Sequence, residues 1–392
     1  MAKLFTPGPI NTTKTVKEAM LDDFGSRDTH FIDAVRTIRS DLLKIVNGDP
    51  ERHTTIPLQG AGSYAVEAVF ANALVIANGG YGYRMINMCE AAEYRHTALK
   101  LPENLQADTA EIEAELKANG ADYALVSVVH CETSTGVFNP IYEIAKLVNK
   151  YTTAHFFVDA MSSFGAVPID LQASPIHFIV SSANKCLQGV PGFSFVIADK
   201  TALEQCKGNC NSWAFDLCSQ LNGLEYNGQF RCTPPVHVML AFLQALREFN
   251  EETFEGRMQR YKRNNEIIRN GMQKIGFKAF DHLISPDKRG WIITAFYYPN
   301  DDNFNFVTLY RELAARHLVI YPGKVAHAPT FRLGNIGDLH ADDCEYLMME
   351  IEEVLKKMDV KIPIIYTKDY DRPRAQSHLN DPHHHAHQQT HS

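Results

Sequence analysis

The sequence predicts an α/β fold, with a mostly parallel sheet flanked by helices and a second, smaller α+β domain. Short apolar runs alternate with helical patterns through the first half of the chain. Glycine-rich or polar turns follow several of these runs, where α/β proteins bind ligands. From about residue 255 long helices and a few strands replace the alternation. We therefore place a large domain at 16–254 and a small domain at 255–362, after an N-terminal segment at 1–15.

Composition and charge exclude several classes of function. The 392 residues are 45% hydrophobic and 21% charged, which is ordinary for a globular protein of two or three domains. A net charge of −8 gives no footprint for nucleic acid or an anionic membrane. We expect no membrane span, because no apolar run approaches the required length, and no signal peptide.

The eight cysteines indicate a reducing compartment rather than a disulfide framework. They are scattered through a chain too long to need covalent staples, so we expect a cytoplasmic protein. Cys206, Cys210 and Cys218 lie close together but lack paired spacing and a fourth ligand. No metal site is expected.

The first part of the chain offers one candidate anion contact. Helical periodicity around 16–21 and again over 31–46 is interrupted by the loop Phe24–Asp28, which holds Arg27. An arginine in a glycine-containing loop can meet an anion, although a solvated surface charge is the usual outcome.

A glycine turn follows the first strand of the predicted sheet. Thr54–Leu58 reads as a strand that runs into Gln59–Ser63, and a helix follows from Tyr64 through Ala73. A strand, a glycine turn and a helix start point backbone N–H groups at an anion, typically a phosphate. The stretch is neither a Walker loop nor a full GxGxxG, and an ordinary tight turn is an equal alternative.

The next stretch has unusual spacing. The helical pattern runs to about Leu74, yet Val75–Ala77 has the pattern of the next strand, which leaves almost no loop. After it, Asn78–Gly82 is another glycine-rich turn. Its Tyr81 ring either lies flat against a planar ligand or is simply packed.

Two polar residues end later strands. A strand over 123–129 leads into His130–Gly136, and after a helix the strand at 155–158 ends at Asp159. A carboxylate at the end of an apolar run must meet a cation or strong donors to remain charged.

Lys185 lies 26 residues after Asp159, in the small-residue turn Ser181–Gly192 between two apolar runs. Its amine is costly to desolvate unless it is used, and a buried amine loses its proton readily. Considered alone, a surface turn lysine is the more frequent outcome. The other residues favour a lysine that carries a cofactor covalently.

Three features together favour pyridoxal phosphate as that cofactor. Its chemistry needs a lysine to carry it, a carboxylate to keep its ring nitrogen protonated and a glycine-rich helix start to hold its phosphate. The chain offers Lys185, Asp159 and Gly60–Ser63, with Tyr81 to cover the ring. No rival cofactor accounts for all four.

The smaller domain and the C-terminal residues complete the chain. A strand at 291–297, a helix at 306–316, strands at 318–321 and 331–337, and a last helix at 342–358 follow two long helices. We expect residues 363–392, which turn polar and histidine-rich, to be disordered.

Over residues 4–358 the chain resembles the class V, fold type I aminotransferases that depend on pyridoxal phosphate. Within that family it is most similar to the branch that transfers the amine of 2-aminoethylphosphonate to pyruvate. The resemblance rests on these motifs: Thr6–Pro9, Leu58–Glu67, Val158–Gly165, Ser181–Phe193, Tyr321–Lys324 and Phe331–Gly337. It implies a seven-stranded type of sheet and a homodimer with shared active sites.

The resemblance also implies roles for individual residues. Lys185 would carry the cofactor and shuttle a proton, and Asp159 would hold the ring nitrogen. The other cofactor-binding positions are Ala61, Gly62, Ser63, Tyr81, Thr133, Asn184 and, from the partner subunit, Thr233. Arg332 would take the carboxylate of pyruvate or alanine and the phosphonate of the donor. Arg27 is a second candidate for the phosphonate.

Two alternatives stay open at this point. The first is the same chemistry on other amines, such as alanine–glyoxylate or serine–pyruvate transfer. The second is a catalytically silent protein of the same fold, because the junction at Asn72–Val75 is several residues shorter than the family pattern and a deletion there could weaken folding or cofactor binding.

Overall fold

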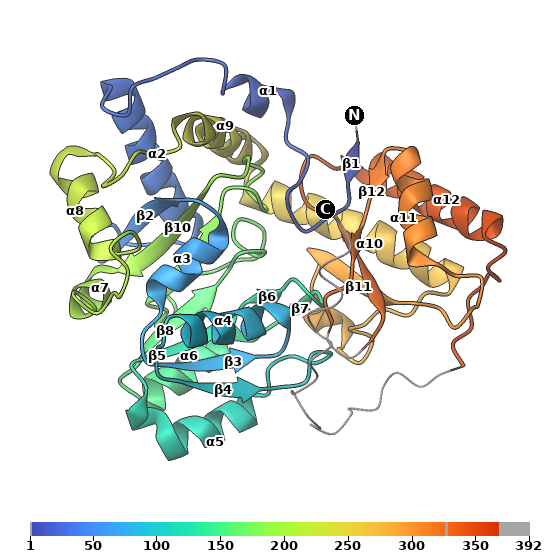
Figure 1. Cartoon of the computed structure of the whole chain (residues 1–392), viewed down its shortest axis with the longest axis horizontal. Coiled ribbons are helices and arrows are strands. Elements are labelled where there is room, and N and C mark those ends of the chain that lie inside the picture. Colours follow the sequence, from blue (N-terminus) through green and yellow to red (C-terminus); the bar gives the residue numbers. More distant parts are fainter. Residues whose placement is uncertain (1, 326–327, 368–392) are drawn as a thin grey trace.

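The computed structural model describes residues 2–325 and 328–367, and its centre is a seven-stranded sheet (Figure 1). The strand order is β2-β10-β9-β8-β5-β3-β4. Within this sheet β10 alone runs antiparallel to its neighbours, so the other six strands point the same way. In sheet order the strands are β2 (His53–Gln59), β10 (Phe193–Asp199), β9 (Phe178–Ser182), β8 (His155–Asp159), β5 (Leu125–Val129), β3 (Ala73–Ala77) and β4 (His96–Lys100).

Helices cover the sheet, and several of its strands are continuous apolar runs. Every residue of β3, β5, β9 and β10 is buried, as expected for strands packed on both faces. One hydrophobic cluster joins these strands to the surrounding helices. The helices of this region are α1 (Lys14–Glu18), α2 (Thr29–Ile45), α3 (Gly62–Val69), α4 (Gly80–Ala91), α5 (Thr109–Asn119), α6 (Ile141–Tyr151), α7 (Lys200–Gln205), α8 (Leu217–Asn227) and α9 (Val236–Glu252).

The smaller region has its own sheet and its own hydrophobic cluster. Strands β11 (Ile293–Tyr297), β14 (Thr330–Gly334) and β13 (Tyr321–Pro322) pair antiparallel in that order. Helix α10 (Phe254–Ile275) packs against α12 (Ala341–Lys357), and α11 (Phe306–Ala315) also packs on α12. The remaining elements are β1 (Lys3–Leu4), β6 (Cys131–Glu132), β7 (Val137–Phe138), β12 (Leu318–Val319) and the 3-10 turns Gly120–Asp122 and Pro286–Lys288.

The N-terminal segment connects the two regions. β1 pairs with β12, and Phe5 belongs to the hydrophobic cluster of the smaller region. Two residues later the carbonyl oxygen of Pro7 accepts a hydrogen bond from Lys185 of the larger region, at 2.7 Å.

The helix predicted over Tyr64 to Ala73 is wrong at its C-terminal end. α3 ends at Val69, and Phe70 is already extended at φ −69° and ψ 145°. The residues from Ala73 onward pair with β4 and β5 and are fully buried, so strand pairing prevails over their helix propensity. The three residues 70–72 form the connection, and the apparent lack of a loop came from a helix drawn too long.

Two further predictions need correction. Asn78–Gly82 is not a complete turn, because α4 begins at Gly80 and takes Tyr81 into its first turn. Residues 363–367 are ordered. Ile364 is buried and its N–H bonds to the Ile275 carbonyl at 2.8 Å, because the apolar chain just after Pro363 completes the small core.

The rest of the predicted disordered tail, from residue 368 on, lies outside the described residues. Among the residues that the structure does describe, no helix has the length and apolar character needed to cross a membrane.

Candidate active site

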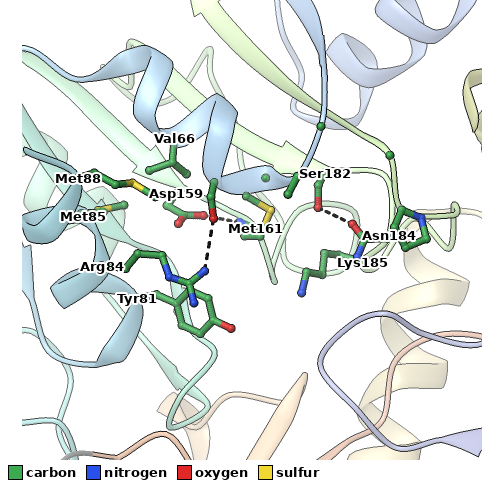
Figure 2. A pocket seen from close by; sticks show the side chains of 16 residues that line it. Val66, Tyr81, Arg84, Met85, Met88, Asp159, Met161, Ser182, Asn184 and Lys185 are labelled. Atoms are coloured by element: carbon green, nitrogen blue, oxygen red, sulfur yellow. Dashed lines mark hydrogen bonds between the residues drawn. The ribbon is translucent and has the colours of Figure 1, made fainter. Parts of the chain in front are cut away.

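The site lies where the parallel strands of the large sheet end. β2, β8 and β9 all finish at one edge, and the turns that follow them surround a cavity of about 410 Å³ (Figure 2). This is the edge at which α/β sheets bind ligands. The lining residues are Gly60, Ala61, Gly62, Ser63, Val66, Tyr81, Arg84, Met85, Met88, Asp159, Met161, Ser182, Asn184, Lys185, Pro191 and Gly192.

Asp159 is a buried carboxyl group without a cationic partner in contact. It ends β8, and its Oδ1 accepts one hydrogen bond from the Met161 backbone N–H at 2.8 Å. It forms no ion pair within the described part of the chain. Burial raises its pKa from 3.8 to about 7, against the lowering effect of the Met161 N–H. A carboxylate in this state fits a ligand that brings an N–H donor.

Lys185 lies in the turn between β9 and β10, across the cavity from Asp159 in Figure 2. Burial lowers the pKa of its amine from 10.5 to about 8, and the nearby Arg332 and Arg84 act in the same direction. Its Nζ donates to the carbonyl oxygen of Pro7. The lowered pKa increases the share of neutral amine near neutral pH, the form that a nucleophile or proton acceptor requires.

The small domain holds the turn that carries Lys185. The carbonyl oxygen of Cys186 accepts hydrogen bonds from Arg257 Nη1 at 2.8 Å and from the Tyr261 hydroxyl at 3.1 Å. The same hydroxyl donates to the side chain of Gln188, which has the left-handed backbone angle φ 61°. Because Arg257 and Tyr261 both belong to α10, that helix fixes the backbone beside the lysine.

The glycine turn after β2 forms a close-fitting cradle at the N-terminus of α3. Gly60 has φ +110°, and a Cβ there would clash with the Tyr64 ring. At Gly62 a Cβ would clash with the Met161 side chain. The first N–H groups of a helix have no intrahelical partner, so this end of α3 presents free donors to an anion in the cavity.

Tyr81 and Arg84 enter the cavity from the first turns of α4 (Figure 2). The Arg84 guanidinium carbon lies 4.6 Å from the centre of the Tyr81 ring, and its Nη1 lies 3.4 Å from Ser63 Oγ. The start of α4 is held by the buried Glu132. Its carboxylate accepts from the backbone N–H groups of Tyr81 and Gly82, at 3.1 and 3.2 Å.

Thr133 and Asn184 lie beside the cavity in different ways. The Thr133 hydroxyl is buried and pairs with the Ser162 hydroxyl at 2.6 Å, and it is not part of the lining. Asn184 does line the cavity, and its Oδ1 accepts from the Ser182 hydroxyl at 3.0 Å.

Arg332 reaches the site from β14 of the small domain. It is 2% exposed, and its guanidinium donates to the carbonyl oxygens of Thr133 and Pro322, each at 3.0 Å. Burial lowers its pKa, while the nearby Tyr81 and Glu132 raise it. The remaining donors of this fork are suited to a planar carboxylate or a phosphonate.

Four predicted residues are not part of the cavity lining: Thr133, Arg332, Thr233 and Arg27. The first two are buried beside the site, whereas Thr233 is exposed just before α9 and Arg27 is exposed between α1 and α2. The single chain therefore does not bring either of these two exposed side chains to Lys185, and their roles stay predictions.

Arg84, Glu132 and Met161 are the site residues that sequence reasoning missed. Arg84 follows Tyr81 by three positions, which on a helix places both side chains on one face. That signal was present but depended on recognising that α4 begins at Gly80. Glu132 and Met161 directly neighbour predicted residues, yet nothing in the pattern shows which way their side chains point.

Comparison with known proteins assigns the chain to a family. Residues 21–303 match the family model for aminotransferase class V. The chain belongs to the class V aminotransferases. A protein of Lysinibacillus sphaericus named 2-aminoethylphosphonate–pyruvate transaminase is 42% identical over 361 residues, covering 90% of this chain and 97% of that protein. A protein of the same name from Salmonella paratyphi C is 43% identical over 364 residues, covering 90% and 97%.

Solved structures agree on the fold. Pyridoxamine–pyruvate aminotransferase from Mesorhizobium loti superposes with a TM-score of 0.82 at 21% identity, covering 92% of this chain and 93% of that one. Aspartate aminotransferase from Thermus thermophilus gives a TM-score of 0.80 at 22% identity, covering 91% and 99%. The chain therefore has the fold type I architecture that its sequence predicted.

The residues present fit pyridoxal phosphate, the cofactor of this family. Asp159 is a buried acceptor that lacks an ion-pair partner in the described chain, Lys185 has a lowered pKa, and no side chain caps the start of α3. These three features would suit three different parts of the cofactor: the ring nitrogen, the aldehyde carbon and the phosphate.

Proposed function

We propose that this class V aminotransferase transfers the amine of 2-aminoethylphosphonate to pyruvate, giving phosphonoacetaldehyde and L-alanine. The observation that carries the proposal is the 42–43% identity, over nearly the whole chain, to proteins named for that reaction. The site supports it, because Lys185 and Asp159 line one cavity and the Arg332 guanidinium lies near enough to lower the pKa of Lys185, as transamination of an anionic amine requires.

The cofactor would be held by groups from four elements. Lys185 would bind it covalently, Asp159 would meet its ring nitrogen, and Ala61, Gly62 and Ser63 would bind its phosphate at the start of α3. Tyr81 would cover the ring, with Thr133 and Asn184 beside it. When bound, pyridoxal phosphate supplies an electron sink for the carbon that loses a proton.

The chain's own residues then do the acid–base work. Asp159, which lines the cavity, would keep a proton at the ring nitrogen. The Lys185 amine would take the proton from the amine-bearing carbon of the donor. In the second half of the reaction it would deliver a proton to the carbon of pyruvate that receives the amine. The donor carbon bears hydrogens and no carboxylate, so a proton rather than carbon dioxide must leave. Arg332 orients the anionic end of each substrate in turn.

The assembly and compartment also belong to the proposal. We propose a homodimer in which Thr233 of one subunit completes the phosphate site of the other, and in which Arg27 assists phosphonate binding. Thr233 is exposed in the single chain, which leaves it accessible to a second subunit. All eight cysteines are free, which supports a reducing, cytoplasmic location.

Substrate profiling tests the proposal. Purified enzyme loaded with pyridoxal phosphate is offered 2-aminoethylphosphonate, alanine or serine as donor, with pyruvate or glyoxylate as acceptor. We expect phosphonoacetaldehyde to form from 2-aminoethylphosphonate with pyruvate. Turnover of alanine with glyoxylate, without any phosphonoacetaldehyde, would contradict the proposal. Absence of all turnover together with absence of cofactor absorbance would indicate a silent protein.

A further inference from the structure

Three cationic side chains gather around the ring of Tyr81. The Arg84 guanidinium lies 4.6 Å from the ring centre, and the Lys324 Nζ lies 5.5 Å from it. Arg332 is the third, since its pKa is influenced by the Tyr81 hydroxyl. Arg332 has a role in the proposed function and Arg84 lines the cavity, whereas Lys324, from the motif Tyr321–Lys324, has no role so far.

Lys324 and Arg332 come from a single hairpin. Tyr321 pairs with Arg332 across β13 and β14, and the Gly323 N–H donates to the Thr330 carbonyl oxygen at 2.8 Å. Lys324 follows immediately. Its carbonyl oxygen packs against the start of α4, where a Cβ on Gly80 would lie 3.3 Å from it. The hairpin therefore brings two cations to the same face of the site.

The nearby carboxylates do not balance these charges. Glu132 is already occupied by hydrogen bonds from the start of α4 and from Ser134. Within residues 2–325 and 328–367, Lys324 forms no ion pair. Desolvation of its amine lowers the pKa of Lys324, and the neighbouring Arg84 and Arg332 lower it further, although Glu132 opposes them. An anion is the group that such a cluster lacks.

The two substrates of the proposed reaction differ in the negative charge of their acidic group. A phosphonate carries up to two negative charges, whereas the carboxylate of pyruvate or alanine carries one. A single guanidinium pairs with either group. A second cation within a few ångströms gains more from the dianion, because Coulomb attraction scales with the product of the charges.

We infer that Lys324 is a specificity-determining residue that, together with Arg332, selects a dianionic phosphonate over a monoanionic carboxylate. This inference rests on the proposed function for its natural substrate. Lys324 contributes the second charge beside the Tyr81 ring, while the buried Arg332 contributes the first.

Ligand binding to the loaded enzyme tests this directly. Ethylphosphonate and propionate are non-reacting probes that carry the same ethyl group and differ in charge. Each is titrated into wild type, Lys324→Met, Lys324→Arg and Lys356→Ala, with the visible absorbance of the bound cofactor as readout. We expect Lys324→Met to lower the affinity for ethylphosphonate roughly three- to tenfold and the affinity for propionate less than about twofold. Lys324→Arg should stay near wild type.

The control and the kinetics separate the possible failures. Lys356 lies on α12 and pairs with Glu352 and Glu353, so Lys356→Ala removes one positive charge from a helix that carries none of the site residues and should leave both affinities unchanged. In turnover, Lys324→Met should raise KM for 2-aminoethylphosphonate and leave KM for pyruvate nearly constant. The inference would be overturned if Lys324→Met lowered the affinities for both probes equally, or if it changed neither affinity. Wild type that binds ethylphosphonate through Lys324 but makes no phosphonoacetaldehyde would refute the proposed function alone.

Discussion

The site has two ends: Asp159 and Lys185, which line the cavity, follow buried strands of the larger region, whereas Arg332 and Lys324, beside Tyr81, come from β14 and from the residues after β13 in the smaller region. At the first end, burial shifts the pKa of both groups toward neutrality. At the second end, two cations lie beside Tyr81. If the proposed roles hold, the chemistry and the choice of substrate are built on separate parts of the fold.

Removing the lysine should have the largest effect. Lys185→Ala takes away both the covalent attachment and the proton shuttle, so alanine formation should fall roughly 10²–10⁴-fold. Lys200 is an exposed lysine at the start of α7, so Lys200→Ala is the matched control and should keep full activity. A Lys185→Ala enzyme that keeps more than half of its activity would show that the amine is not the catalyst.

Replacing the buried carboxyl group should come next. Asp159→Asn can still accept from the Met161 N–H but cannot hold a proton on the ring nitrogen, so kcat should fall roughly 10²–10³-fold. The folded pKa is raised from 3.8 to about 7, so the cofactor-free wild type loses stability as pH rises across that window. In urea unfolding, the free energy of unfolding of the variant should therefore rise relative to that of wild type between about pH 4 and pH 7. A difference in unfolding free energy that does not change with pH would contradict a raised pKa at Asp159.

A change at the substrate end should act on binding more than on the chemical step. Arg332→Lys keeps the charge but loses the fork, so kcat/KM for both substrates should fall roughly 10- to 100-fold, as for the loss of charge-assisted hydrogen bonds. The spectrum of the bound cofactor should change little. If the variant instead fails to bind pyridoxal phosphate, the separation between the two ends does not hold.

The pH dependence of cofactor capture gives the smallest but most specific effect. The pKa of Lys185 is lowered from 10.5 to about 8, and only the neutral amine attacks the cofactor. The rate at which cofactor-free enzyme captures pyridoxal phosphate should rise with pH to a midpoint near 8 and then level off. A rate that is still rising steeply above about pH 9.5 would indicate an unshifted amine.

The sequence was sufficient for the parts of the site that end a strand. Lys185 and Asp159 follow apolar runs, and the carboxyl ends of parallel strands meet at one edge, so their convergence follows from topology alone. Arg84 could not be placed, because the glycines at 79, 80 and 82 look like a turn although the helix starts among them.

Long-range pairing explains the remaining errors. Residues 70–74 include good helix formers, and only their partners β4 and β5 decide that Ala73 begins a strand. Residues 363–367 look like the start of a polar tail until the contacts of Ile364 with the small core are known. The role proposed for Thr233 would need a second subunit, so a single chain cannot show it.

A half-reaction in the absence of acceptor tests the central claim most directly. Loaded enzyme is mixed with 2-aminoethylphosphonate alone, and phosphonoacetaldehyde is counted against active sites. The enzyme is then freed of donor and given pyruvate. We predict one equivalent of aldehyde per site, followed by one equivalent of L-alanine, and neither product from Lys185→Ala. No aldehyde from a fully loaded wild-type enzyme would contradict the account.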